Sequence, residues 1–297
     1  MKRFGVILSI FTLWVSLIGG CKPSFQPGAY IDDMNRSVTI NQTPQRIAAY
    51  GPSITEILYA LGMQDKVVGV DSLSNYPEAA KSKPQLGDAF TPSIEKLVEL
   101  KPDLVLTLKQ QQFNTDLDNL GIKYMVIDPG NIDGIYKDIR LIGKITGTDA
   151  NAESVIGDMK KKADDVQNRV GKAPRLKVIF LVDTTDLNSP WTAGPGSFMD
   201  SLITMAGGVN VAANASAPWV QLSMEQIISA DPDIVILPDQ YAVSPQTLKV
   251  HPAWQNTNAV KNNRVFTING DIVSRPGPRI AQGIEEVAKI IHPELYK

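Results

Sequence analysis

The 297-residue chain is poor in the residue types that build covalent cross-links and metal sites, since it has one cysteine, Cys21, and two histidines, His251 and His292. A single cysteine excludes an internal disulfide. A tetrahedral zinc site needs three or four cysteine, histidine or carboxylate ligands, and the two histidines do not pair at the spacing of such a site. We therefore predict no bound metal and no resident cofactor.

The sequence also lacks the motifs of common enzymes and any excess of positive charge. The segment GPGSF at 194–198 is neither the nucleophile elbow G-x-S-x-G nor a phosphate-binding loop, and Ser197 within it is more simply a helix cap. No serine, histidine and aspartate set is visible. The formal net charge of −2 argues against a nucleic-acid-binding surface. We predict a protein that is not an enzyme and does not bind nucleic acid.

The first twenty residues have the pattern of an export signal. Lys2 and Arg3 precede an apolar segment, 5–20, that would span about 24 Å as a helix, which is short for a membrane-spanning segment. It ends in LIGGC, which resembles the lipobox of bacterial lipoproteins and would make Cys21 the lipidated first residue of the mature chain. We expect a signal peptide at 1–20, a lipidated tether at 21–29, and an exported protein anchored to the cell membrane, facing the periplasm or the exterior.

One phrase of the sequence occurs twice, as SIEKLVELKPDLVLT at 93–107 and as SMEQIISADPDIVIL at 223–237. Each copy predicts an amphipathic helix, a turn at Pro-Asp and a buried parallel strand. Ser93 is expected to cap the first helix. The apolar faces of the two helices are predicted to consist of Ile94, Leu97 and Val98 in the first copy and of Met224, Ile227 and Ile228 in the second.

The repetition extends beyond these segments and predicts the fold class. Further strands are expected at 46–51 and 123–128 in the first half and at 177–182 and 264–269 in the second, with helices between them. Such alternation gives a parallel sheet with helices on both faces. We predict an α/β protein of two similar lobes with mainly parallel sheets, at 30–147 and 173–297. A small hairpin at 30–41 would lie on the first lobe.

A long amphipathic helix is predicted between the lobes, at 148–172. Its apolar residues step by three and four positions: Ala152, Val155, Ile156, Met159, Ala163, Val166 and Val170. Two lobes joined in this way enclose a cleft at the carboxyl ends of their strands, where open α/β sheets bind ligands. Because a continuous helix resists bending, we expect the lobes to move little against each other.

Seven residues are expected in loops that face the cleft, namely Leu73, Tyr76 and Phe90 in the first lobe and Trp191, Trp219, Asp271 and Arg275 in the second. The tryptophans could cover the flat face of a ligand. Asp271 could accept hydrogen bonds from ligand amides or hydroxyls, and Arg275 could donate them to carbonyls or carboxylates. The alternatives are that each tryptophan packs beneath its own lobe and that Asp271 and Arg275 form only a mutual surface pair.

The motifs PQRIAAYGPSITEILYALG, VVGVDSLSNYP, HPAWQNTNAVKNNRVFTI and RPGPRI, together with the repeated phrase, make the chain similar to a known family. It resembles the cobalamin and ferric-siderophore substrate-binding proteins of ABC importers, the class III periplasmic binding proteins, from about Tyr30 to Tyr296. The resemblance implies a monomer whose Glu95 and Glu225 dock, one per lobe, onto arginines of a permease dimer. The alternative is that each glutamate only complements the positive end of its helix.

The resemblance also bears on the ligand. Trp191, Trp219 and Asp271 match positions that contact the corrinoid in cobalamin binders, whereas Leu73, Ala89 or Phe90, and Leu108 replace aromatic residues of that pocket. With two tryptophans, one aspartate and one arginine, a corrinoid is favoured. A ferric siderophore would want more arginines, and haem an axial tyrosine or histidine, for which Tyr76 is a candidate. A lipid-anchored surface protein without a transport role is the alternative of a different class.

Overall fold

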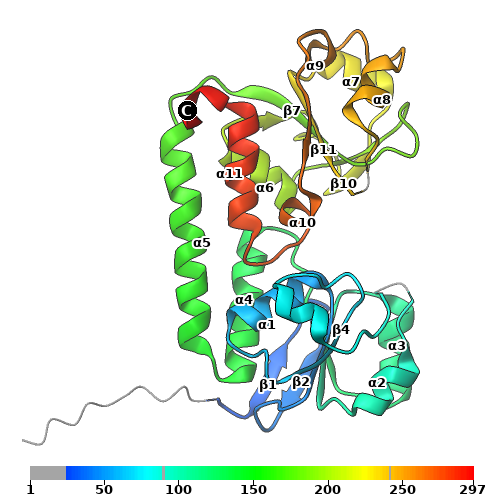
Figure 1. Ribbon diagram of the computed structural model, residues 1–297, viewed down its shortest axis with the longest axis vertical. Coiled ribbons are helices and arrows are strands. Elements are labelled where there is room, and N and C mark those ends of the chain that lie inside the picture. The colour runs from blue at the N-terminus through cyan, green and yellow to red at the C-terminus, as the bar shows by residue number, and fades with distance from the viewer. Residues whose placement is uncertain (1–24, 89–90, 241) are drawn as a thin grey trace, which may run out of the picture.

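The computed structural model describes residues 25–88, 91–240 and 242–297, and it has two α/β lobes stacked along the long axis of the molecule (Figure 1). The N-terminal lobe holds a four-stranded parallel sheet in the order β4-β3-β5-β6, formed by Val67–Val70, Ile47–Tyr50, Leu104–Thr107 and Tyr124–Val126. Both central strands, β3 and β5, are buried along their whole length because helices cover the two faces of the sheet. The predicted strands of this lobe are therefore confirmed.

Four helices accompany this sheet: α1 (Pro52–Ala60), α2 (Ile94–Leu100), α3 (Gln111–Asn119) and α4 (Ile132–Thr146), with a short 3-10 turn η1 (Glu78–Ser82). The predicted hairpin is formed by β1 (Gly28–Ile31) and β2 (Ser37–Ile40), which pair antiparallel. It lies beside β6, where the Asp33 amide donates to the Val126 carbonyl over 3.1 Å.

The C-terminal lobe has a mixed sheet in the order β10-β8-β7-β11-β12, with β9 also paired to β7. Its strands are β7 (Leu176–Asp183), β8 (Trp191–Ala193), β9 (Gly208–Asn210), β10 (Trp219–Gln221), β11 (Ile234–Pro238) and β12 (Val265–Ile268). Its helices are α6 (Phe198–Met205), α7 (Met224–Ala230), α8 (Pro245–Val250), α9 (Asn258–Lys261), α10 (Gly270–Val273) and α11 (Ile280–Ile291), followed by η2 (Pro293–Tyr296). Strands β7, β9, β11 and β12 run parallel, whereas β8 and β10 are antiparallel additions. The prediction of two similar lobes with mainly parallel sheets is confirmed, and within the described residues β8 and β10 have no counterpart in the sheet of the N-terminal lobe.

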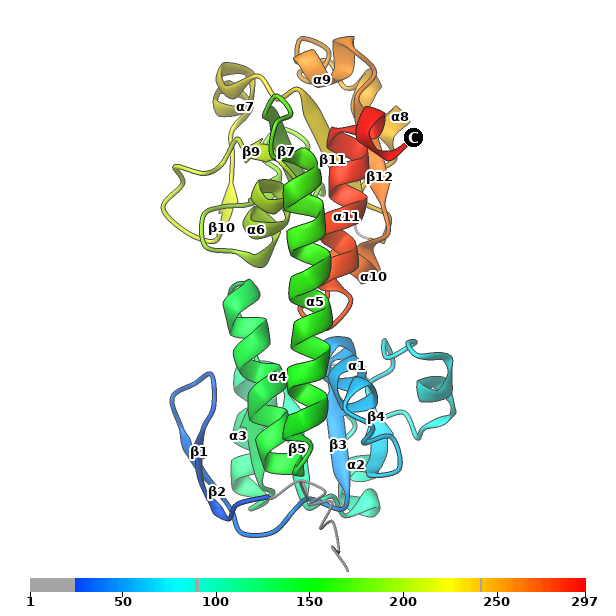
Figure 2. The ribbon, with the colours of Figure 1, turned by 90° about the vertical axis from the view of Figure 1, so that its left-hand side faces the viewer.

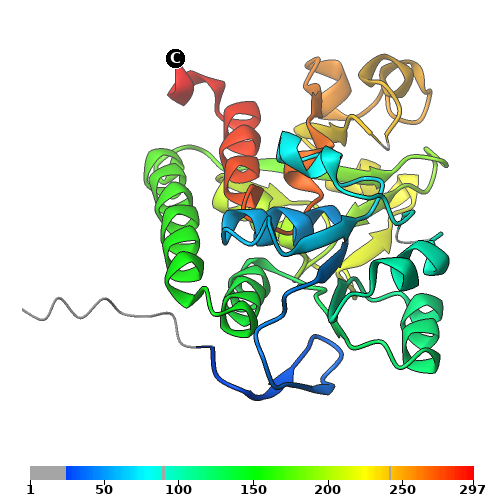
Figure 3. The same ribbon diagram turned by 60° about the horizontal axis from the view of Figure 1, so that its bottom comes forward.

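Helix α5 (Asp149–Val170) joins the lobes along one side of the molecule (Figures 2 and 3). It packs on α4 of the N-terminal lobe and on α11 of the C-terminal lobe, and every predicted apolar position except the half-buried Val155 is buried. At Gly143 of α4 an added Cβ would lie 2.7 Å from the Ala152 side chain, so the two helices need a glycine there. One core cluster runs from the first sheet through α5 into the second lobe.

None of the helices in the described ranges is both long enough and apolar enough to cross a membrane. The predicted signal peptide and Cys21 lie outside these ranges.

The repeated segments fold as predicted, into α2–β5 and α7–β11, but their helices bury less than the pattern suggested. Leu97 and Ile227 are buried, whereas Val98 and Ile228 are exposed, because each short helix turns only one row of side chains toward its sheet. Ser93 also makes no side-chain capping hydrogen bond, contrary to expectation.

Candidate ligand cleft

A pocket of about 350 Å³ lies between the lobes, at the carboxyl ends of the strands. The N-terminal lobe contributes segments that follow β3, β5 and β6: Pro52, Ser53, Leu108, Asp128, Pro129 and Gly130. The C-terminal lobe contributes the start of α6, the approach to β10 and the segment after α10: Phe198, Pro218, Trp219, Ser274, Arg275 and Pro276. The pocket is therefore a true interlobe site.

The two tryptophans lie on strands rather than in loops, which corrects the sequence prediction. Trp191 begins β8 and Trp219 begins β10, and the two strands pair antiparallel with Trp219 opposite Ala193 and Gln221 opposite Trp191. In this register both indole side chains share one face of the ribbon. Trp219 packs edge-on against Phe198, with ring centroids 5.6 Å apart, and lines the pocket. Trp191 does not line it, and both tryptophans are about 40% exposed.

Asp271 and Arg275 are brought together, but as part of a cluster that joins the two lobes. Asp271 lies in the short helix α10, and Arg275 donates to it over 2.5 Å. Asn75 of the N-terminal lobe donates to Asp271 over 3.0 Å and accepts from Arg275 over 2.7 Å. Both charged side chains are nearly buried, so the expected alternative of an exposed surface pair does not describe them.

Two members of this cluster were missed by sequence reasoning. Glu56 of α1 is buried and accepts a bidentate pair of hydrogen bonds from Arg279, at 2.9 and 2.6 Å, and a third from Arg275 at 3.3 Å. Glu56 is the only charged residue in α1, and a lone charge among buried neighbours is the signal that could have identified it.

The remaining first-lobe candidates lie beside the cluster. Tyr76 carries the Arg279 guanidinium 4.1 Å above its ring centroid, and the Leu73 carbonyl accepts from Arg275 over 3.3 Å. Both side chains are about half exposed and neither lines the pocket. Phe90 lies outside the described residues. Leu108, in contrast, forms part of the pocket wall.

Two side chains of the cluster, Asp271 and Arg279, have pKa values shifted toward their ionised forms. Burial alone would raise the pKa of Asp271, but hydrogen bonds from Gln240 and Asn75 and the charges of Arg275 and Arg279 lower it overall. Burial would likewise lower the pKa of Arg279, and its hydrogen bonds to Glu56 raise it instead. Both shifts favour the charged forms of Asp271 and Arg279.

Glu95 and Glu225 occupy the second residue of α2 and of α7, at opposite ends of the molecule and away from α5 (Figure 1). Both are exposed, and neither forms an ion pair or a side-chain hydrogen bond with any residue in the described ranges. Their docking role stays a prediction.

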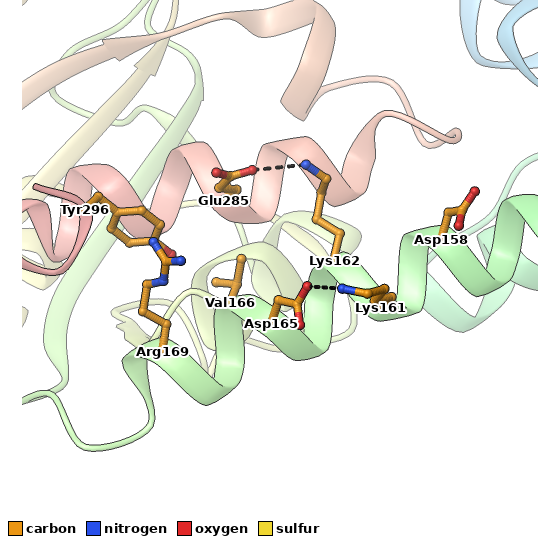
Figure 4. A pocket seen from close by; sticks show the side chains of 8 residues that line it. All are labelled: Asp158, Lys161, Lys162, Asp165, Val166, Arg169, Glu285 and Tyr296. Carbon is orange, nitrogen blue, oxygen red and sulfur yellow. Dashed lines mark hydrogen bonds and ion pairs between the residues drawn. The ribbon is translucent and has the colours of Figure 1, made fainter.

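A second pocket, of about 330 Å³, lies between α5 and α11 and is shown in Figure 4. Lys162 reaches from α5 to Glu285 of α11 over 3.1 Å, and the Arg169 guanidinium lies 4.6 Å from the ring centroid of Tyr296. Lys161 pairs within α5 to Asp165 over 2.7 Å. The Lys162–Glu285 pair and the Arg169–Tyr296 contact join the linking helix to the C-terminal lobe.

Among the described residues, no group of three or more histidine, cysteine, aspartate or glutamate side chains is arranged to hold a metal ion.

Two lobes, one linking helix and an interlobe pocket define a two-lobed binding protein, and comparison with known proteins gives the family. The profile of the periplasmic binding protein family matches residues 47–272. The chain belongs to this family, which confirms the resemblance found in the sequence.

Individual relatives differ in what their names state. An uncharacterized ABC transporter substrate-binding lipoprotein of Bacillus subtilis is 31% identical over 316 aligned residues, covering 100% of this chain and 99% of the relative. A cobalamin-binding protein of Halobacterium salinarum is 30% identical, covering 88% of this chain and 73% of the relative. The crystal structure of a possible iron-binding, periplasmic solute-binding protein of Staphylococcus epidermidis has a TM-score of 0.75 and 31% identity, covering 84% and 100% of the two chains.

Proposed function

We propose that the protein is the extracytoplasmic substrate-binding lipoprotein of an ABC importer and that it captures a corrinoid in the interlobe pocket. The main support for this ligand is the β8–β10 ribbon. Trp191 and Trp219 lie on one face of the ribbon, and Trp219 lines the pocket. Large exposed indoles at a cleft suit a broad, flat ligand. The name of the Halobacterium relative supports the same ligand.

The charges of the pocket wall favour a corrinoid over the runner-up, a ferric siderophore. Within the described part of the chain, Arg275 is the only cationic residue of the wall, and it already donates to Asp271 and Asn75. Asp128 adds a carboxylate to the same wall. A trianionic catecholate complex would need several free arginines. A corrinoid periphery of neutral amides needs hydrogen-bonding partners instead, which these side chains supply. The name of the Staphylococcus protein, a possible iron-binding protein, supports a ferric siderophore as the second candidate.

Haem is less well matched by the same wall. A haem-binding pocket offers an axial tyrosine, histidine, cysteine or methionine to the iron. Among the described residues, the twelve that line the pocket include none of these four types. Tyr76, the candidate from the sequence, lies beneath the Arg279 guanidinium instead.

The pocket volume indicates how a corrinoid would sit. About 350 Å³ is near the lower end of small-molecule sites, which range from roughly 300 to 1,000 Å³. A ligand larger than the pocket would extend over the exposed β8–β10 ribbon. This arrangement would use both tryptophans, with Trp219 in the pocket wall and Trp191 beyond the pocket on the same face of the ribbon.

Delivery completes the proposed function. Lipidation of Cys21 would hold the monomer at the membrane surface, and Glu95 and Glu225 would meet one permease subunit each. Their exposure, the absence of partners for them in the described residues and their separation at the two ends of the molecule support this role.

A co-elution experiment tests the ligand. The mature protein is incubated separately with cyanocobalamin, haemin and a ferric tris-catecholate, and each mixture is passed over a gel-filtration column. We expect cyanocobalamin to co-elute at one molecule per chain and the other two to separate. Retention of the ferric complex alone would establish the runner-up, and retention of none would refute both.

A further inference from the structure

The polar cluster between the lobes is built from both sides of the cleft. Glu56, Asn75 and the Leu73 carbonyl come from the N-terminal lobe, and Asp271, Arg275 and Arg279 come from the C-terminal lobe. The loop between α10 and α11 reaches the start of α1 in both side views (Figures 1 and 2). At Gly277 of this loop an added Cβ would lie 3.3 Å from the Ser53 carbonyl oxygen, so the backbones are in close contact.

We propose that Glu56 and Arg279 are positioning residues: their buried ion pair sets the spacing of the two lobes and holds Arg275 at the ligand pocket. Neither residue lines the pocket, so both would act through Arg275, which does. Glu56 accepts from both arginines and thereby fixes where the Arg275 guanidinium lies.

The charges of the cluster balance only when the lobes are together. The N-terminal lobe contributes one carboxylate, Glu56, whereas the C-terminal lobe contributes two guanidinium groups and one carboxylate. Separation would therefore leave one unpaired charge on each lobe. Glu56 is 3% exposed, so most of its solvation comes from the two arginines. Breaking one partner of such a buried pair is costly, because the remaining charge keeps the desolvation without the attraction.

The other side of α5 shows why this cluster matters for lobe spacing. A groove of about 570 Å³ lies there, with Tyr136 of α4, Lys160 of α5 and Ser201 of α6 among its lining residues. Figure 2 shows α4 and α6 on one side of α5 and α1 and α11 on the other. A groove thus separates the lobes on one side of α5, and the polar cluster connects them on the other side. Helix α5 alone would permit small changes of angle, which the cluster opposes.

A buried ion pair contributes more to geometric definition than to stability, since apolar residues of equal volume can be as stable. Arg279 donates two hydrogen bonds to the Glu56 carboxylate in a planar, bidentate arrangement. A lysine would keep the charge but could not reproduce that arrangement. The pair therefore selects one lobe spacing among several that α5 would allow.

The test measures lobe spacing without any ligand. Spin labels are placed on cysteines introduced at Gln111 of α3 and Gln246 of α8, both exposed and one in each lobe, in a Cys21→Ser background. We expect a single narrow distance distribution in the parent and a longer, broader one in Glu56→Gln. Removal of one partner should shift the ratio of joined to separated lobes by about a hundredfold or more.

Two further variants complete the test. Arg279→Lys should broaden the distance distribution less than Glu56→Gln does, and it tests the role of the ion pair if Glu56→Gln does not fold. Glu153→Gln removes the exposed bidentate pair with Arg140 between α4 and α5, at 2.6 and 3.1 Å, which does not bridge the lobes. This control should leave the distances unchanged. Distances in Glu56→Gln and Arg279→Lys equal to those of the parent would overturn the proposal.

A second measurement connects the pair to the pocket and rests on the proposed function. Cyanocobalamin affinity should fall by about tenfold or more in Glu56→Gln, because the binding-competent spacing becomes a minor population. If the parent does not bind cyanocobalamin, the ligand assignment fails while the ligand-free distances still decide the role of the pair. If distances broaden and affinity is unchanged, the pair sets spacing without serving the pocket, and that part of the proposal is wrong.

Discussion

The segments α2–β5 and α7–β11 show which parts of a repeated sequence serve the fold and which do not. In both, the helix ends at a left-handed residue, Lys101 with φ 45° and Asp231 with φ 47°. In both, the following aspartate accepts from the backbone that enters the neighbouring strand: Asp103 from Gln45 and Arg46, and Asp233 from Lys177. The shared Pro-Asp turn is thus structural. The shared glutamates form no side-chain hydrogen bond or ion pair with the described residues.

The two copies differ at the start of the helix. Ser223 accepts from the Gln226 amide while the Gln226 side chain accepts from the Ser223 amide, which together form a capping box. Ser93 makes no such hydrogen bond, and Lys96 stands where Gln226 does. The two equivalent serines are therefore expected to contribute differently to the free energy of unfolding.

The largest expected effect comes from the glutamates. We predict that Glu95→Lys with Glu225→Lys abolishes uptake of the ligand, because like charges would then meet at the transporter. Each single reversal should reduce uptake in part. Ligand affinity and melting temperature should stay near those of the parent, since exposed charges contribute little to folding. Full transport by the double variant would show that both glutamates only complement the positive ends of their helices.

The next largest effect comes from the β8–β10 ribbon of the C-terminal lobe, which carries Trp191 and Trp219 on one face. Replacing Trp191 and Trp219 with alanine should weaken ligand binding by about 2 kcal/mol or more, given ~1 kcal/mol for each aromatic contact. Isothermal titration measures this loss. In the parent, saturating ligand should quench the intrinsic fluorescence. Unchanged affinity in the double variant would show that the ribbon does not contact the ligand.

The repeated turns provide a smaller and matched pair of effects. Asp103→Ala should destabilise the fold by roughly 2 kcal/mol and Asp233→Ala by somewhat less, because hydrogen bonds to a charged group contribute about 1.5–3 kcal/mol and Asp103 accepts from two backbone amides. Denaturant unfolding measures both. A larger loss for Asp233→Ala would contradict this account of the turns.

The smallest effect tests the difference between the two caps. Ser223→Ala should cost about 1 kcal/mol of unfolding free energy, the usual weight of a helix cap, whereas Ser93→Ala should be close to neutral. The two substitutions are chemically identical and lie at equivalent positions, so each is the control of the other. Equal losses would show that the hydrogen bonds of the capping box add nothing here.

The sequence analysis did not predict the short antiparallel strands β8 and β10. β8 and β10 have three residues each, too few for an alternating pattern, and they form only because β7 offers an edge. Trp219 lines the interlobe pocket and Trp191 does not, and the sequence did not predict that both lie on one face, since that face exists only once the two strands pair. The predicted burial of Val98 and Ile228 was wrong for a related reason. Their spacing is helical, but the contact between each short helix and its sheet is too narrow to cover them.

The sequence by itself determined the two-lobed α/β fold, the linking helix and the family, because strand runs, helical spacing and an internal repeat are local patterns. Only the tertiary structure decided the partners of Asp271 and Arg275. Arg275 and Arg279 are 219 and 223 residues from Glu56 in the chain, and the carboxylate is buried by contacts that form only when the lobes come together. No local pattern encodes a pair of that separation, because its energy depends on excluding water from both partners at once.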